Sequence, residues 1–485
     1  MPLRLSLVAL AAAALLSACA AGPDYVRPTM PVPAAYKESG DWKPADPRPA
    51  ASGMAWWTGY GDPVLDGLEA DADNANQNIR QAEATYRQAK AIVDEDRAGL
   101  FPTLGATLGA ERGRSNTSGV THTGNSFSLG LAGSWEPDLW GSVRRQIESG
   151  VASAQASADD LAAARLSIQT TLAQDYLQLR IADQQRDLYA TTIDAYTKAL
   201  KLTSAQHAAG VALQSDVSLA EAQLAQAQAA AVDLEATRAQ LEHAIAVLTG
   251  RAPAQLNVTR ATPNQPLSLQ MPSTPAGLPS ALLEHRPDIA SAERHAAAAN
   301  ANIGVAKAAY FPQLTLSASG GFGAAALGNL FDTPGRVWSL GAALAQTIFD
   351  GGLRTARVKQ AEAAYDITVA QYKQTVLGGF QQVEDELALL RLLNQETAFQ
   401  DQAVRSSLQA EQSAIAQYRA GTVSYLNVVT TQTTLLNNQR TLVQLRGRLV
   451  AASISLVSAT GGGWSASDPL AAPVAASSAS SAQAQ

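Results

Sequence analysis

The stretch AGLFPTLGA, residues 98–106, returns in altered form as AAYFPQLTL at residues 308–316. Each copy places Phe-Pro-x-Leu after a segment of helical composition and before a segment in which apolar and small residues alternate. Proline ends a helix and forces the residue before it toward extended backbone. Pro102 and Pro312 are therefore predicted to mark two helix–strand junctions in one chain.

The two junctions belong to a repeat that runs through most of the sequence. Equivalent residues lie 210 positions apart near the junctions and 211 apart further on. The matched pairs are Ile79 and Ile289, Glu83 and Glu293, Phe101 and Phe311, Pro102 and Pro312, Gly141 and Gly351, Arg144 and Arg354, Gly210 and Gly421, and Gly250 and Gly461. One single-residue shift over such a length indicates that a whole structural unit is duplicated.

Each junction is followed by two segments in which apolar residues occupy every second position. Apolar residues alternate with Ser, Thr, Gly and Ala at 104–110 and 126–135 in the first unit, and at 314–319 and 338–345 in the second. Strands of this pattern either cover a soluble core with one face or line a membrane barrel. The uncharged small face favours the barrel, as do three tryptophans near the strand ends, where an aromatic girdle would lie: Trp135, Trp140 and Trp338.

Very long helices are predicted after each pair of strands. No proline occurs from 138 to 252 or from 335 to 468, and one interior proline costs a helix roughly 3 kcal/mol. Apolar residues there recur at heptad-like spacing, which is typical of helices packed as coiled coils. We expect helices at 142–209 and 352–420, glycine turns at Gly210 and Gly421, and shorter helices returning to Gly250 and Gly461. A further helix of about 30 residues should precede each junction, from Asp66 to Leu100 and from Asp288 to Tyr310.

The amino terminus has the pattern of an export signal. Residues 1–18 combine Arg4 with an apolar segment that is too short for a membrane anchor. LSAC, Leu16 to Cys19, resembles the lipobox of bacterial lipoproteins, which implies an N-acyl diacylglycerol lipid on Cys19, the single cysteine. The alternative is a chance cysteine in a small-residue cleavage region. Ala20, rather than Asp, favours release to the outer membrane in the lipoproteins that this stretch resembles.

These features divide the chain into six parts. They are a signal peptide at 1–18, a lipidated proline-rich strap at 19–65, the first repeat at 66–252, a proline-rich linker at 253–287, the second repeat at 288–464 and a disordered tail at 465–485.

Composition argues against several classes of function. A net charge of −7 without a basic stripe argues against binding to nucleic acid. The five histidines lack metal-ligand spacing, and no catalytic or nucleotide-binding motif occurs in a suitable setting. The glycines of 320–328 are interpreted as an extracellular loop. We therefore expect no enzyme, no metal and no cofactor other than the lipid on Cys19.

Four strands cannot close a barrel, and an open strand edge is not tolerated in hydrocarbon. Three copies would supply 12 strands, which fits the even strand numbers of outer-membrane barrels. The predicted fold is an α+β membrane channel, a homotrimer in which a 12-stranded β-barrel continues into a long periplasmic α-helical barrel.

The lipobox, the strap, the two β-β-α units opened by FPTL and FPQL, and the two glycine turns together resemble the TolC-like outer-membrane efflux factors. The resemblance is strongest to their lipoprotein branch, the OprM or NodT type, and covers about Cys19 to Trp464. It implies a homotrimeric outer-membrane channel with a large periplasmic part. Its partners would be a periplasmic adaptor and an inner-membrane pump of the resistance-nodulation-division class, and its cargo drugs and other toxic compounds.

The same resemblance puts a gate at the periplasmic tip of the helices. Gly210, Tyr418, Gly421, Tyr425, Leu426 and Asn427 match tip or gate positions, and Asp216 stands six residues after Gly210. Asn427 and Thr430 occupy places where TolC has acidic residues, so the resemblance does not extend to an acidic constriction that binds cations. Asp216 has a second interpretation, as an acid that stabilises the positive end of a helix.

Two other functions remain open on the sequence alone. The same channel could serve a type I protein secretion system. A lipid-tethered structural protein of the periplasm would explain the heptads and Cys19, but it leaves four alternating strands without a purpose.

Overall fold

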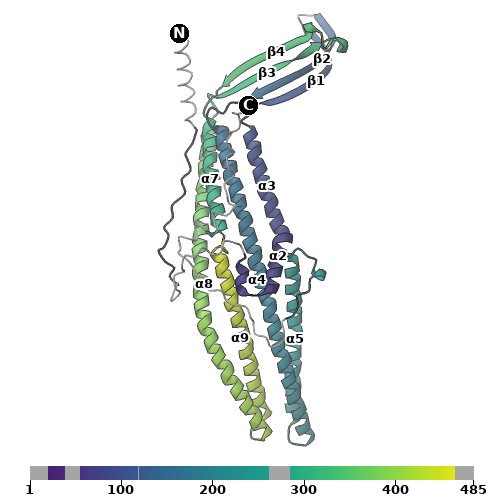
Figure 1. Cartoon of the computed structure of the whole chain (residues 1–485), viewed down its shortest axis with the longest axis vertical. Coiled ribbons are helices and arrows are strands. Elements are labelled where there is room, and N and C mark those ends of the chain that lie inside the picture. Colours follow the sequence, from purple (N-terminus) through teal and green to yellow (C-terminus); the bar gives the residue numbers. More distant parts are fainter. Residues whose placement is uncertain (1–19, 39–54, 118–119, 261–284, 465–485) are drawn as a thin grey trace, which may run out of the picture.

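The computed structural model describes residues 20–38, 55–117, 120–260 and 285–464. Long helices form a rod, and a four-stranded sheet projects from one end of it (Figure 1). The predicted signal peptide, Cys19 and the predicted tail lie outside the described residues, as do parts of the strap and of the linker.

The elements follow one another in the same order in both halves of the chain. The first half contains η1 (Trp56–Tyr60), α2 (Pro63–Ala75), α3 (Gln77–Ala98), β1 (Thr103–Thr117), β2 (Val120–Trp135), α4 (Ser142–Ala208) and α5 (Gln214–Leu248). The second contains α7 (Pro287–Ala308), β3 (Gln313–Ala324), β4 (Arg336–Ala345), α8 (Leu353–Arg419) and α9 (Tyr425–Ala459). Short 3-10 turns occur at Pro253–Gln255, Leu327–Asn329 and Thr333–Gly335. Matching helices have equal lengths, with 22 residues in α3 and α7, 67 in α4 and α8, and 35 in α5 and α9, which confirms the repeat.

The helix predicted from Asp66 to Leu100 is wrong in one respect, because the chain breaks at Asn76. Asn76 has extended backbone, and its Oδ1 accepts the N–H groups of Asn78 (2.8 Å) and Ile79 (3.1 Å). This cap starts α3, while the Nδ2 of Asn76 donates to the backbone oxygen of Leu248 at 2.8 Å. A side chain that caps one helix and holds the end of another outweighs the helical pattern around it.

Both Phe-Pro junctions are confirmed as changes from helix to strand. α3 ends four residues before Pro102 and β1 begins directly after it, and α7 and β3 have the same relation to Pro312. Trp140 holds the second junction, since its Nε1 donates to the backbone oxygen of Pro312 at 2.6 Å and its ring stacks on Phe311 at 4.8 Å. Trp140 therefore packs inside the junction rather than facing outward as a girdle residue.

The sheet is antiparallel in the order β1-β2-β3-β4, with β1 and β4 at its open edges. Because side chains alternate between the two sides of a strand, the register separates the sheet into two faces. The large-residue face includes Leu104, Leu108, Leu131, Trp338, Leu340 and Leu344, all more than half exposed in the single chain. The small-residue face includes Thr107, Ser128, Ser317, Ser319 and Ser339.

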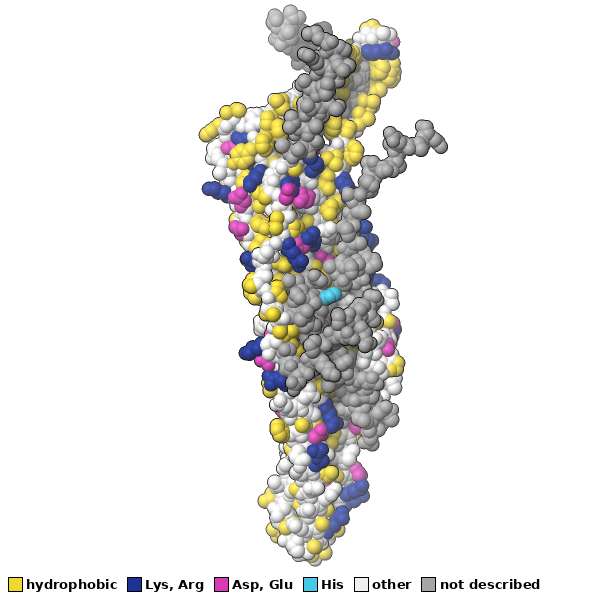
Figure 2. Space-filling view, turned by 60° about the vertical axis from the view of Figure 1, so that its left-hand side comes forward, with side chains coloured by type: hydrophobic (Ala, Val, Ile, Leu, Met, Phe, Trp, Pro, Cys, Tyr) yellow, Lys and Arg dark blue, Asp and Glu magenta, His cyan; other side chains and the backbone are white. Residues whose placement is uncertain are grey.

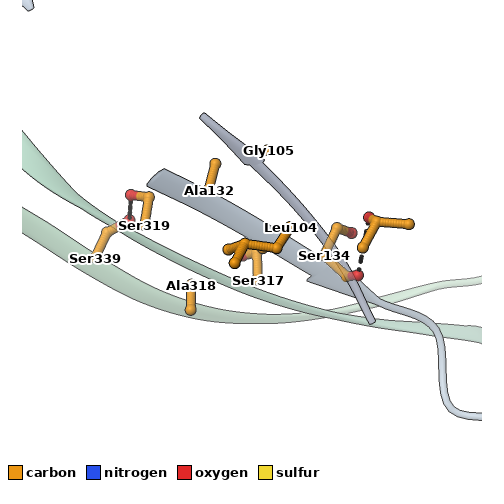
Figure 3. Close-up of a pocket in the computed structure, with 10 residues that line it drawn as sticks. Leu104, Gly105, Ala132, Ser134, Ser317, Ala318, Ser319 and Ser339 are labelled. Atoms are coloured by element: carbon orange, nitrogen blue, oxygen red, sulfur yellow. Dashed lines mark hydrogen bonds between the residues drawn. The ribbon is translucent and has the colours of Figure 1, made fainter. Parts of the chain in front are cut away.

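The small-residue face is hollowed near the junction end. A concavity of about 560 Å³ lies there, and serine, glycine, alanine and threonine provide most of its wall. The hydroxyls of Ser319 and Ser339 are 2.8 Å apart across β3 and β4 (Figure 3). The face is thus polar without carrying charge along this part of the sheet.

The interpretation of 320–328 as a loop is wrong for its first five residues. They complete β3, where Gly321 is paired with Gly130. A side chain at Gly321 would collide with the backbone oxygen of Leu129. These glycines allow the strands to pair closely. The number of glycines in a segment cannot distinguish such a strand from a loop.

Residues 20–38 form an extended strap that contacts both repeats. Arg145 of α4 donates to Asp24 (2.8 Å) and to the backbone oxygen of Ala21 (3.1 Å). At the far end, the Glu384 carboxylate of α8 accepts the N–H groups of Lys37 (2.7 Å) and Glu38 (2.9 Å). The strap therefore ties the chain just after Cys19 to the top of α4 and to the middle of α8.

Glu69 of α2 has a buried carboxyl group. Glu69 is 0% exposed, and neither of its carboxylate oxygens has a hydrogen-bond partner among the described residues. Burial, and after it the nearby charge of Asp73, raises the pKa of Glu69 to about 9. In the folded chain Glu69 therefore keeps a proton that it releases above about pH 4.5 in the unfolded chain.

This burial predicts a pH-dependent stability. As pH rises from about 4.5 to about 9, Glu69 should reduce the free energy of unfolding by up to roughly 1.4 kcal/mol per pH unit. Glu69→Gln, which removes the titration, should raise the thermal unfolding midpoint in detergent, and more at pH 8 than at pH 5. The control is Glu221→Gln at an exposed site of α5. A gain for Glu69→Gln that is equal at both pH values would contradict this prediction.

The junctions generate a second prediction. Pro102→Ala together with Pro312→Ala should let α3 and α7 extend toward the strands and disturb the contact of Trp140 with the second junction. We expect a smaller fraction of the protein to migrate as an oligomer on unheated gels. A normal oligomer fraction in the double variant would show that the prolines are not needed for assembly.

Candidate functional site at the helical tip

Two tight turns lie together at the end of the rod farthest from the sheet (Figure 1). Gly210 joins α4 to α5, Gly421 joins α8 to α9, and each has a φ of 74°. This left-handed conformation favours glycine, and a Cβ added at either residue would have no atom of a described residue beyond its chain neighbours within 4 Å. The predicted turns are therefore open surface features whose shape depends on glycine.

An aromatic cluster lies directly above the turns. The rings of Tyr418, at the end of α8, and Tyr425, at the start of α9, are 5.3 Å apart and tilted by 55°. Tyr418 is 9% exposed and Tyr425 only 2%, and Ala220 of α5 and Val428 of α9 complete the buried cluster. The packing of α5 against α9 here joins the α4–α5 hairpin to the α8–α9 hairpin.

One polar contact crosses the same joint. The Tyr418 hydroxyl lies 3.4 Å from the Oγ1 of Thr203, a fully buried residue of α4. Separating the tips of the two hairpins would break this contact and the packing of the tyrosines against Ala220.

Asp216 takes part in the tip in two ways. Its Oδ2 accepts the N–H of Leu213 at 3.3 Å, so it caps the first turn of α5. Burial raises the pKa of Tyr425 to about 12, and the charges of Tyr418, Tyr196 and Asp216 add to this effect. The structure thus supports the capping interpretation of Asp216 while also bringing its charge near the tyrosine cluster.

The other predicted tip residues face outward. Leu426 is 58% exposed, and Asn427 beside it is also exposed. They share the tip surface with two residues of the other turn, Val211 (76%) and Leu213 (70%). The structure therefore separates the predicted residues into a buried joint and an exposed apolar tip.

Sequence reasoning missed Thr203, Ala220 and Val428. Val428 follows Tyr425 by three residues, and this helical spacing could have identified it. Thr203 and Ala220 carry no such signal, because only the packing of α4 and α5 against α8 and α9 brings them to the tyrosines. Among the described residues, no group of three His, Cys, Asp or Glu side chains is arranged to hold a metal ion.

A sequence profile of one protein family matches both halves of this chain. The family is described as outer membrane efflux protein, and the match covers residues 70–251 and 278–462. These two segments contain α3 to α5 and α7 to α9, together with the strands between them.

Individual relatives match over nearly the whole length. The chain is 34% identical over 471 residues to the pyoverdine export outer membrane protein OpmQ of Pseudomonas aeruginosa, covering 95% of this chain and 97% of the relative. It is 30% identical to the toluene efflux pump outer membrane protein TtgC of Pseudomonas putida, with 95% and 96% covered. The solved structure of the outer-membrane channel OprN aligns with a TM-score of 0.85 at 30% identity, over 92% of this chain and all of that one.

The tip predicts a change in conductance. Replacing Asp216 and Tyr418 with Ala should raise single-channel conductance in planar bilayers, because the first change removes charge and the second opens the joint between the hairpins. Tyr418→Phe, which keeps the ring but loses the hydroxyl near Thr203, should have a smaller effect. Unchanged conductance in correctly assembled Ala variants would contradict the gate assignment.

Proposed function

The chain belongs to the outer membrane efflux protein family, and from this premise we propose that it is the outer-membrane duct of a tripartite efflux system. The sheet would lie in the outer membrane and the rod would extend through the periplasm. The duct would be passive, and an inner-membrane pump would supply the cargo and the energy.

One observation carries this proposal, namely the two-faced sheet with open edges. Its large-residue face suits lipid, and its small-residue face, which is uncharged near the junctions, suits the wall of a wide passage. The edges β1 and β4 need partners in a membrane. A homotrimer would pair β4 of each copy with β1 of the next and close a 12-stranded barrel, as the sequence predicts.

The exposed tip supports docking to a periplasmic adaptor. Val211, Leu213 and Leu426 form an apolar surface at the far end of the rod, where water would otherwise contact it. An adaptor that covers these residues would connect the duct to a pump of the resistance-nodulation-division class. Because the joint of Tyr418 and Thr203 lies just above, docking is positioned to influence opening.

The strap supports lipid anchoring at Cys19. Ala21, two residues after Cys19, donates its N–H to the backbone oxygen of Trp140 at 3.0 Å. Trp140 itself packs against the helix–strand junction. An acyl group on Cys19 would therefore begin close to the level at which the rod meets the membrane.

The proposed cargo is drugs and other toxic compounds. The two relatives described above are named for export of pyoverdine and efflux of toluene, which differ greatly in size and polarity. This range fits a duct that accepts whatever its pump delivers. The names of these relatives also favour efflux over the alternative role in type I protein secretion.

Deletion of the gene tests this proposal. In the organism that encodes the chain, deletion should lower the inhibitory concentrations of dyes, detergents or antibiotics several-fold, and expression of the full chain should restore them. Unchanged susceptibility together with loss of a secreted protein from the medium would support the protein-secretion alternative instead.

A further inference from the structure

The large-residue face of the sheet changes character toward its far end. Cross-strand pairing aligns Leu108, Leu129, Phe322 and Arg336 in one row on this face. On β1 the same face continues through Ala110 to Arg112 and Arg114. On β1 the apolar surface is therefore followed by two arginines, whereas on β4 Arg336 is the first residue of the strand and lies level with the outer apolar row of Leu108 and Leu129.

These three arginines have no partner within the described part of the chain. Arg112, Arg114 and Arg336 are exposed, and none forms a hydrogen bond or an ion pair with another described residue. Glu111, the adjacent acid on β1, points to the small-residue face. Figure 2 shows basic side chains beside hydrophobic surface at the far end of the sheet. Among the described residues, the positive charge of these arginines is thus unpaired.

The height of the apolar surface identifies where the side chain of Arg112 would lie. Trp135 and Phe127, on the large-residue face of β2, are eight residues apart, or about 27 Å along the strand. Tilting a strand by about 40° reduces this to roughly 20 Å, close to the ~25 Å apolar band of outer-membrane barrels. Arg112 is opposite Asn125, two residues beyond Phe127. Its guanidinium would therefore reach the headgroups just above the hydrocarbon.

We propose that Arg112, Arg114 and Arg336 bind the phosphate groups of lipid headgroups in the outer leaflet. The inference rests on the proposed membrane function, which orients the far end of the sheet toward the outside. A guanidinium pairs with phosphate through two parallel hydrogen bonds, and the aliphatic stem of arginine can lie along the apolar surface below it. Phosphate would supply the negative charge that the large-residue face lacks.

The edge positions extend this site between copies. Arg112 and Arg114 lie on β1 and Arg336 on β4, the two strands that the proposed homotrimer brings together. Lipids at this seam would then meet arginines of both chains. Headgroup binding would hold the seam between copies at the level where the barrel leaves the hydrocarbon.

Native mass spectrometry can test the site with the purified full-length protein in detergent. The probe is lipid A, which carries two phosphates, and the comparison is dephosphorylated lipid A. If each arginine contributes about fivefold to the affinity, Arg112→Gln with Arg114→Gln should weaken lipid A binding about 25-fold. Adding Arg336→Gln should increase the loss to about 125-fold, while the dephosphorylated lipid should bind all forms equally weakly.

The matched control replaces two exposed arginines of the rod, Arg87→Gln and Arg357→Gln, and should leave the affinity for lipid A unchanged. Equal binding of lipid A to the parent and to the triple variant would overturn the proposal, as would equal binding of phosphorylated and dephosphorylated lipid to the parent. Single-channel conductance in bilayers of phosphatidylcholine is measured in parallel. Normal conductance with lost lipid A binding would support the site, and absent conductance in the parent would instead refute the proposed duct.

Discussion

Hydrogen bonding of the strand edges is the constraint on which the rest of this structure depends. Among the described residues, β1 and β4 each pair with one neighbouring strand, so the backbone N–H and C=O groups on their outer edges have no strand to pair with. In hydrocarbon each such group costs several kcal/mol. A duplication that provides two strands per repeat therefore produces a chain that must associate with copies of itself. A single sheet in a membrane would leave both of its edges unpaired, whereas a closed ring of such sheets would leave none.

The rod follows from the same duplication. α4 and α8 each begin soon after a strand and run for 67 residues without a proline, so every strand pair continues into a long helix. The hairpins of the two repeats meet again at the tip, where Tyr418 contacts Thr203 and the tyrosines pack against Ala220. One chain thus connects a sheet with open edges to a tip. At this tip the two helical hairpins can separate only by losing buried contacts. A conduit with a closure at the end opposite the membrane is the arrangement that these connections support.

The parts of the fold that depend on local backbone chemistry could be predicted from the sequence. Pro102 and Pro312 predict both junctions because proline limits the backbone in any context, and period-two alternation predicts all four strands. The break at Asn76 could not be predicted, because its second partner is the end of a helix 172 residues away. The strand position of the glycines of 320–324 could not be predicted either, because their small size is required only by pairing with a strand from the other repeat. At the site, the tyrosines could be identified from the resemblance to a family, whereas Thr203 required the packed hairpins.

The number of chains in the assembled protein tests the central claim most directly. The full-length protein, extracted from the outer membrane in mild detergent, can be weighed by native mass spectrometry. If the edges of β1 and β4 are satisfied by other copies in a 12-stranded barrel, the mass must correspond to three chains. A monomer, or any other number of copies, that still conducts ions in planar bilayers would contradict the account.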